Sequence, residues 1–159
     1  MSIEVRRLSK KDIPQAAKLV HGMWMQHVDQ TPEILKKSYI ASFDVESYLE
    51  KYQQDPNTAV FVAVSNSDIV GVARVEIKPA AEGMYNFDKV AYFDDLVVDS
   101  SHQHHGASIA LTAARLDFVK SNKVKVCESR IYEYNIPAQA AALKNGFSPI
   151  YTSYYKFLD

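Results

Sequence analysis

The amino-acid sequence predicts one α/β (α+β) domain built around a mixed sheet, and three observations support this fold class. The chain has 159 residues, which is enough for one domain with a core of its own and short for two. Segments with strand-like apolar patterns alternate with segments of helical spacing. No repeat, linker or low-complexity tract separates them. We therefore expect a single domain over residues 1–159.

The composition excludes several classes of protein. Hydrophobic residues make up 47% of the chain and charged residues 23%, as in a packed globular domain. The formal net charge of -1 predicts no general attraction to nucleic acid or to an anionic membrane. Cys127 is the only cysteine, and no secretion signal or apolar run of about 18 residues is present, so we expect a cytoplasmic protein.

The N-terminal segment predicts a strand followed by a helix. Residues 3–6 alternate apolar and polar side chains, which is typical of a short strand. Ser9, with Asp12 three positions later, is typical of a capping pair. The next segment carries an apolar stripe at helical spacing, which we expect to face the core; it consists of Ile13, Ala16, Ala17, Val20, Met23 and Trp24.

Two further helix starts are indicated before the sheet. Thr31 precedes Pro32, a pair that predicts a capping hydroxyl and a proline at the first helical position. Asp44 predicts the start of a third, short helix that runs towards Gln54. The Asp-Pro-Asn sequence at 55–57 predicts a turn.

The middle of the chain predicts a hairpin and a third strand, and the rest alternates helices with strands. Residues 59–64 and 69–75 are β-rich runs separated by a polar turn, and 90–98 is a further strand. A helix is expected over 106–120, with its apolar side formed by Ile109, Ala113 and Leu116. The remaining expected elements are a strand at 124–131, a helix at 137–144 and an aromatic, strand-like end at 148–158.

The most informative segment is the junction between the strand ending at Val98 and the helix starting at 106. The first amides of a helix have no partners within the helix, and its dipole adds positive charge there. Small residues at 106–108 would let a phosphate approach the main chain, a geometry that suits a diphosphate. Such a junction is a weak signal when taken alone, because tight turns also use glycine for structural reasons.

The residues of this turn resemble a known motif. The run Gln103, His104, His105, Gly106, Ala107 and Ser108 is similar to the Gln/Arg-x-x-Gly-x-Gly/Ala motif with which enzymes of the GNAT acetyltransferase superfamily hold the pyrophosphate of acetyl-CoA. Ser108 departs from the motif, but a serine is small and adds a hydroxyl donor. Two downstream elements also match the family: residues 135–138 resemble Asn-x-x-Ala, and 144–147 resemble Lys-x-Gly-Phe.

The resemblance implies a GNAT-like mixed, mostly antiparallel central sheet flanked by helices, and it covers residues 90–147 closely. It implies acetyl-CoA as cosubstrate without a metal ion, and transfer of the acetyl group to a primary amine. Main-chain groups of Leu96, Val97 and Val98 would contact the pantetheine arm, and Asn135 would contact it from the neighbouring strand end. A homodimer is a further expectation from the resemblance.

The chemistry to be supplied is attack of a neutral amine on a thioester, which needs a proton acceptor and a donor for the leaving thiolate. Asp94 and Asp95 are the nearest candidates to accept the proton, and the resemblance favours Asp94 because several family members carry a glutamate at this position. Neighbouring strand residues face opposite sides unless a bulge intervenes. The alternative is that both carboxylates only pair with basic neighbours.

The usual acid is missing from this chain. Many relatives have a tyrosine four residues before the glycine of Gly-Phe, where this chain has Ala142. Tyr154 is the substitute that we nominate among the aromatic residues of the terminal segment, which also include Tyr151 and Tyr155. Packing is the commoner role of an aromatic residue on a strand.

The acidic pair predicts a cationic acceptor, either a small-molecule or a peptide amine. Two alternatives remain open: a CoA-binding regulatory module without turnover, which Ala142 favours, and a phosphate- or nucleotide-binding module unrelated to CoA. The histidines at 102, 104 and 105 lack a complementary ligand set, so no metal site is expected. Cys127 has apolar neighbours and is expected to be an inert thiol.

Overall fold

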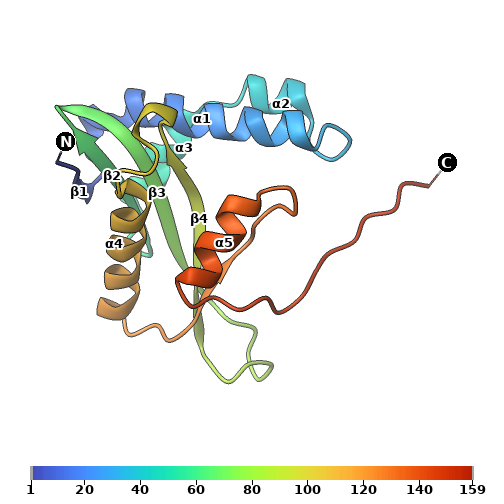
Figure 1. Ribbon diagram of the computed structural model, residues 1–159. Helices are drawn as coiled ribbons and strands as arrows, with labels where there is room; N and C mark the ends of the chain where they lie inside the picture. Colours follow the sequence, from blue (N-terminus) through green and yellow to red (C-terminus); the bar gives the residue numbers. More distant parts are fainter. Residues whose placement is uncertain (1, 159) are drawn as a thin grey trace. The chain divides into compact units, whose positions relative to one another are not determined.

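The computed structural model describes residues 2–158 and forms two compact units, Met1–Glu128 and Ser129–Asp159 (Figure 1). The first unit contains the long strands and most of the helices, and the second contains the last helix and the C-terminal segment. The single domain over 1–159 stays a prediction. The elements, in chain order, are β1 (Glu4–Arg7), η1 (Lys10–Asp12), α1 (Ile13–Gln30), α2 (Lys37–Ala41), α3 (Val45–Gln54), β2 (Thr58–Ser65), β3 (Asp68–Pro79), β4 (Lys89–Val98), η2 (Ser100–His102), α4 (Ala107–Ser121), β5 (Cys127–Ser129) and α5 (Ile136–Lys144).

The five strands form one sheet in the order β1-β2-β3-β4-β5. The pairs β1–β2, β2–β3 and β3–β4 are antiparallel. The polar turn of the predicted hairpin holds Asn66 and Ser67, both with positive φ, which suits the tight connection between β2 and β3. The predicted mixed, mostly antiparallel sheet with flanking helices is confirmed.

Helices cover both faces of the sheet. Val72 of β3 belongs to the core cluster with residues of α1 and α3. Its neighbour Gly71 faces α4, where a Cβ atom would lie 3.0 Å from Cδ1 of Leu111. Because adjacent strand residues point to opposite faces, α1 and α3 lie on one face and α4 on the other (Figure 1). The α1 face of the core consists mainly of Ile13, Ala16, Ala17, Val20, Val45, Leu49, Val60 and Val62.

Two predicted helix caps, at Ser9 and at Asp44, are present in the structure. The Asp12 carboxylate accepts the N–H of Ser9 at 2.8 Å, so these two residues form the expected capping pair. Asp44 accepts the N–H of Ser47 at 3.0 Å and starts α3 as predicted.

The helix start predicted at Thr31 is wrong. Residues 31–36 form turns, and the next helix begins only at Lys37. The hydroxyl of Thr31 donates to the carbonyl of His27 at 2.7 Å, and the Thr31 N–H is directed to the same carbonyl at 2.9 Å. Thr31 therefore satisfies the carbonyl end of α1 and is used as a C-cap, a role that its sequence context did not reveal.

The apolar side predicted for the helix over 106–120 is also wrong. Ile109 is 64% exposed and Ala113 is exposed. The buried side is formed instead by Ala107, Leu111, Thr112, Arg115 and Val119. The prediction chose apolar residues for the buried side, and it missed the actual buried side because that side contains an arginine.

The last two predicted strands differ from the structure. The strand at 124–131 is shorter, with β5 limited to Cys127–Ser129. No regular secondary structure occurs over 147–158, where Tyr154 is 91% exposed. Aromatic composition raises strand propensity, but a strand also needs a paired neighbour, and composition alone does not supply one.

Candidate functional site

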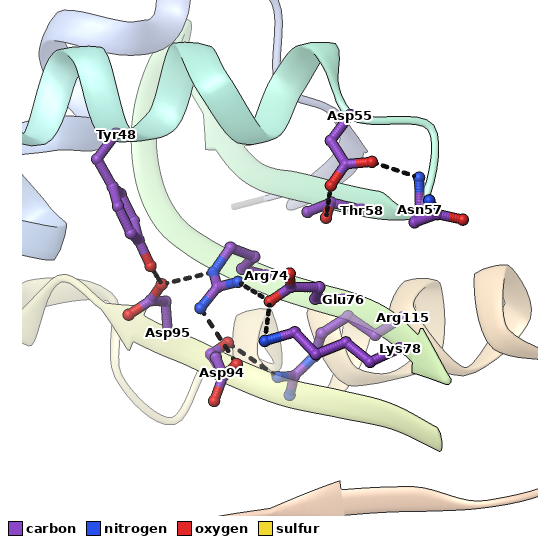
Figure 2. Close-up of polar contacts among 10 residues, drawn as sticks. All are labelled: Tyr48, Asp55, Asn57, Thr58, Arg74, Glu76, Lys78, Asp94, Asp95 and Arg115. Atoms are coloured by element: carbon purple, nitrogen blue, oxygen red, sulfur yellow. Dashed lines mark hydrogen bonds and ion pairs between the residues drawn. The ribbon is translucent and has the colours of Figure 1, made fainter. Parts of the chain in front are cut away.

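A β-bulge in β4 forms the centre of the candidate site. Ala73 on β3 pairs with Leu96, whereas the next residue, Arg74, pairs with Asp94. Asp95 is therefore the extra residue on β4, and its φ of +42° is in the left-handed region. The bulge breaks the strict alternation of the strand, so the side chains of both aspartates reach the same arginine (Figure 2).

Arg74 binds three carboxylates while it is almost fully buried. Its side chain is 8% exposed, and its guanidinium nitrogens lie 3.1 Å from Asp94 Oδ2, 2.9 Å from Asp95 Oδ2 and 3.0 Å from Glu76 Oε2 (Figure 2). The guanidinium also lies 4.2 Å from the ring centre of Tyr52. Burial lowers the pKa of Arg74, but the negative charges around it outweigh burial and raise this pKa above its ordinary value.

Asp95 is held by donors from three different elements. Its Oδ1 accepts the indole N–H of Trp24 on α1 at 3.0 Å. Its Oδ2 accepts the hydroxyl of Tyr48 on α3 at 2.5 Å and the Nε of Arg74 at 2.9 Å. Burial, followed by the charge of Asp95, raises the pKa of Tyr48, which keeps its hydroxyl a donor. Asp95 therefore ties the bulge to both helices on this face of the sheet.

Asp94 is less constrained than its neighbour. Its side chain is 36% exposed, and among residues 2–158 its Oδ2, but not its Oδ1, is in an ion pair, with Arg74. Burial raises the pKa of Asp94, Arg74 lowers it, and the charges of Asp95 and Glu76 raise it again, with a net rise. A partly exposed carboxylate with a raised pKa is suited to accept a proton. Both aspartates do pair with Arg74, but they differ in burial and in the number of donors they bind.

On the opposite face, Arg115 of α4 lies beneath the same part of β4. It is 3% exposed, and its guanidinium is 4.3 Å from the ring centre of Phe93. Its Nη1 is 3.5 Å from the main-chain oxygen of Asp94 (Figure 2). Its Nη2 is 3.2 Å from Oγ1 of Thr112. Within residues 2–158, its Nε has no hydrogen-bond partner.

The turn before α4 has the open amides that the sequence predicts. Gly106 is the N-cap with a φ of +86°, and a Cβ atom built there would meet nothing within 4 Å. The Ala110 N–H is the first to bond back into the helix, to the Gly106 oxygen at 3.0 Å. Over the described chain, the N–H groups of residues 106–109 have no protein acceptor. This arrangement can bind an anion.

The predicted pantetheine strand, Leu96 to Val98, pairs with β3 on one edge. On the other side β5 is short and is tied to β4 lower down, where the Ala91 N–H donates to the Val126 oxygen at 2.9 Å. Leu96 is 37% exposed. Among the described residues up to Glu128, β3 is the strand paired with 96–98, and main-chain groups on the other edge of this segment can bind an extended amide chain.

The two remaining predicted site residues belong to the second unit. Asn135 is the N-cap of α5, and its side chain accepts the N–H of Ala138 at 3.3 Å. Tyr154 lies in the irregular segment over 147–158. The predicted cofactor contact of Asn135 and the predicted acid role of Tyr154 stay predictions.

The histidines of the turn serve local contacts. His102 Nδ1 lies 3.3 Å from Asp99 Oδ1, and His105 Nδ1 lies 2.8 Å from the Gln103 oxygen. Across residues 2–158, no group of three or more His, Cys, Asp and Glu side chains is arranged to hold a metal ion. Burial raises the pKa of the half-buried Cys127 thiol. No helix among the described residues has the length and apolarity needed to cross a membrane.

Sequence reasoning missed most of the ionic network around the two aspartates. Two signals could have indicated it. Arg74 stands inside an apolar strand, and Arg115 stands in an apolar helical run, where an unpaired charge is costly. The missed residues are Trp24, Tyr48, Arg74, Glu76 and Arg115.

A family model described as Acetyltransferase (GNAT) family matches residues 28–147. This range includes the bulge, the outer edge of β4 and the turn before α4. No curated protein matches the chain. The resemblance noted in the turn and in the two downstream elements thus extends over most of the chain.

Solved structures with the same fold cover nearly the whole chain at low identity. A mutant of the BH1408 protein from Bacillus halodurans has a TM-score of 0.86 at 21% identity and covers 98% of this chain and 99% of its own. The aminoglycoside N-acetyltransferase AAC(6')-Iy, in complex with CoA, has a TM-score of 0.78 at 16% identity, covering 99% and 95%. The aminoglycoside acetyltransferase meta-AAC0020 from an uncultured soil metagenomic sample, in complex with sisomicin, has a TM-score of 0.67 at 21% identity, covering 99% and 97%.

Proposed function

The chain belongs to the GNAT acetyltransferase family, a family of acyltransferases that use acetyl-CoA, and on this premise we propose that it transfers an acetyl group to a primary amine of a small molecule or peptide by direct attack. The observation that carries the proposal is the combination of open amides at residues 106–109 with a partly exposed carboxylate, Asp94, at the bulge of the neighbouring strand. The first can hold a diphosphate, and the second can accept a proton.

Acetyl-CoA would bind along the end of β4 and the turn that follows. The diphosphate would accept hydrogen bonds from the amides of Gly106, Ala107 and Ser108, with Gln103, His104 and His105 forming the turn. The pantetheine amides would pair with the outer main-chain edge of residues 96–98, and Asn135 would contribute a further contact. No metal ion is part of this proposal.

The reaction needs one bond to form and one to break. The amine nitrogen attacks the thioester carbonyl carbon, the new C–N bond forms, and the C–S bond breaks to release the CoA thiolate. Asp94 would remove the proton of the attacking amine through a water molecule, because it keeps one carboxylate oxygen outside its ion pair. Asp95 would contribute by fixing the bulge, because its oxygens bind Trp24, Tyr48 and Arg74.

The thiolate needs a proton or a stabilising donor, and Tyr154 is proposed as that donor. The position at which many relatives carry a tyrosine is Ala142 in this chain. A tyrosine on the C-terminal segment supplies the same phenolic group.

The charges at the bulge favour a cationic acceptor. Asp94, Asp95 and Glu76 carry three negative charges against the two positive charges of Arg74 and Lys78, which all belong to one network. Two structural neighbours are aminoglycoside acetyltransferases, and one is in complex with sisomicin. These facts support a polyamine, an amino sugar or a peptide amine as the acceptor class.

The test is a thiol-release assay with acetyl-CoA and a panel of amines, run on three proteins. We expect wild type to release CoA in the presence of at least one cationic amine. Asp94→Asn should bind acetyl-CoA normally and lose about 10²- to 10⁴-fold in turnover, the usual contribution of a general base. Gly106→Trp should lose acetyl-CoA binding, because an indole would fill the open space over the amides.

The matched control for the glycine variant is Gly83→Trp. Gly83 also has a positive φ, +70°, and open space around it, but it lies in the loop between β3 and β4. Its substitution should leave acetyl-CoA binding intact. Titration of acetyl-CoA that shows binding without thiol release across the panel would favour the regulatory module instead. Thermal protection by ATP and not by CoA would favour a nucleotide-binding module.

A further inference from the structure

Arg115 is a buried cation without a carboxylate partner. It is 3% exposed, and in the described residues none of its guanidinium nitrogens is in an ion pair. Its contacts are the main-chain oxygen of Asp94, the hydroxyl of Thr112 and the ring of Phe93. Burial lowers the pKa of Arg115 to about 10, so it remains charged at neutral pH.

Packing does not require a charge at this position. Removing a guanidinium from water costs free energy that a neutral hydroxyl and one long contact to a carbonyl recover only in part. An unbranched apolar side chain such as methionine would fill a similar volume without this cost. The reason for a charged residue at position 115 must therefore be sought in the groups that its guanidinium contacts.

The guanidinium of Arg115 lies under the peptide that carries the proposed base. Its Nη1 is directed at the oxygen of Asp94, the residue just before the bulge (Figure 2). Arg74 contacts the Asp94 carboxylate from β3, and Arg115 contacts the Asp94 main chain from α4. The base is thus held between two buried arginines, and only one of them has its charge compensated.

We propose that Arg115 is a positioning residue of the acyl-transfer site, which holds the Asp94 peptide from beneath β4 and favours the ionised form of the Asp94 carboxyl. The inference rests on the proposed function, in which Asp94 accepts the amine proton. The same positive charge lies on the sheet face opposite to Arg74 and acts on negative charge that develops above the bulge during acyl transfer.

The other charges around Asp94 set the background for this effect. Burial and the carboxylates of Asp95 and Glu76 oppose ionisation of Asp94, and Arg74 with Lys78 favours it. Arg115 itself also lies near the thiol of Cys127 on β5, whose pKa is raised by burial. These groups stay in place when only Arg115 is changed, so a single substitution isolates its contribution.

The test compares Arg115→Met with Arg115→Lys, with Arg7→Met as a control for the loss of a guanidinium that lies against aromatic rings. The pKa of the Asp94 carboxyl is followed by NMR titration, and turnover is followed as thiol release. The methionine variant should raise the pKa of the Asp94 carboxyl, because it removes a positive charge from beneath the Asp94 main chain, and lower kcat about tenfold with an unchanged KM for acetyl-CoA, because the base is held less firmly. The acidic limb of its pH–rate profile should move to higher pH by the same amount, and the lysine variant should restore most of both effects.

Arg7 shares aromatic and main-chain oxygen contacts with Arg115, but its side chain is exposed, so it controls for the loss of these contacts and not for burial. Its guanidinium lies 5.4 Å from the ring centre of Phe61 and 5.2 Å from that of Phe118 on α4, and its Nη2 is 3.4 Å from the Thr58 oxygen. It lies on β1, away from the bulge. Arg7→Met should leave the Asp94 titration and the kcat profile unchanged.

Several results would overturn the inference. An Asp94 pKa that is the same in wild type and Arg115→Met, or an equal shift in Arg7→Met, would remove the electrostatic role. If the methionine variant does not fold, Arg115→Gln is the neutral replacement, and an unchanged Asp94 titration in that protein counts against the inference in the same way. Absence of thiol release by wild type would reject the proposed function, whereas the NMR titration would still decide whether Arg115 acts on Asp94.

Discussion

Two arginines lie on opposite faces of the sheet at the same bulge, and their surroundings differ sharply. Arg74 faces α1 and α3 and binds three carboxylates within 3.1 Å. Arg115 faces β4 from α4, and its partners among the described residues are two neutral oxygens. Both are nearly inaccessible to solvent, and burial acts on both to lower the pKa. Neighbouring negative charges outweigh the effect of burial on the pKa of Arg74 but not on that of Arg115.

The difference indicates that burial of a cation can serve two purposes in one fold. The carboxylates around Arg74 depend on it, because removing Arg74 leaves the buried Asp95 without its cation. Among the described residues no buried carboxylate is paired with Arg115, so replacing it with an apolar side chain removes the free-energy cost of burying its charge. We therefore expect Arg74 to be needed for folding, and Arg115 to be needed for activity but not for stability.

The largest effect is expected for Arg74→Met. It would leave the side chain of Asp95, which is 8% exposed, without its cation and Glu76 with Lys78 alone, at a cost of about 3–5 kcal/mol in the free energy of unfolding. Urea denaturation followed by circular dichroism measures this loss. Arg115→Met, as the comparison variant, should unfold at the same or a higher urea concentration. Equal losses in the two variants would contradict the distinction between them.

The fold was largely predictable from the sequence because local signals and packing agree in most elements. The capping residues Ser9 and Asp44, the hairpin and the order of strands and helices follow from patterns within a few residues. The errors occur where the deciding partner is distant in sequence. Thr31 caps the helix before it, and the segment 148–158 has strand composition without a paired strand.

A second, smaller effect is expected for Asp95→Asn. The carboxylate oxygens of Asp95 accept hydrogen bonds from Trp24, Tyr48 and Arg74. In the asparagine variant an NH₂ group replaces one of these oxygens, and a donor then faces a donor. We expect a loss of about 1.5–3 kcal/mol, the range for hydrogen bonds to a charged group. Asp94→Asn should cost no more than about 1 kcal/mol, because that carboxylate is partly exposed. Similar losses at the two positions would mean that burial does not separate their roles.

The candidate site was predictable only in part, for a related reason. The turn at 103–108 is a local motif, and its open amides follow from chain geometry alone. The acidic pair was also visible in the sequence, but its division into a buried anchor and a partly exposed carboxylate was not. That division depends on the bulge and on Arg74, which lies 20 positions from Asp94 in the sequence and opposite it in the sheet.

The smallest effect is expected for Tyr48→Phe, which tests the hydrogen bond between α3 and the bulge. Tyr48→Phe removes one hydrogen bond to the charged Asp95 and should lower the free energy of unfolding by about 1.5 kcal/mol at neutral pH, the low end of the range for such bonds, with a smaller effect on thiol release than Asp94→Asn. The pKa of Tyr48 in the folded protein is raised above 10.0, so its contribution to stability is complete below pH 10 and is lost as the pH rises further, when the unfolded chain ionises first. The stability difference between wild type and Tyr48→Phe should therefore shrink above pH 10. Tyr52→Phe, whose ring also lies beside Arg74, serves as the control for loss of a phenolic hydroxyl at this face of the sheet. A pH-independent difference for Tyr48→Phe would show that its hydroxyl is not held as a buried donor, and the bulge would then lose its link to α3.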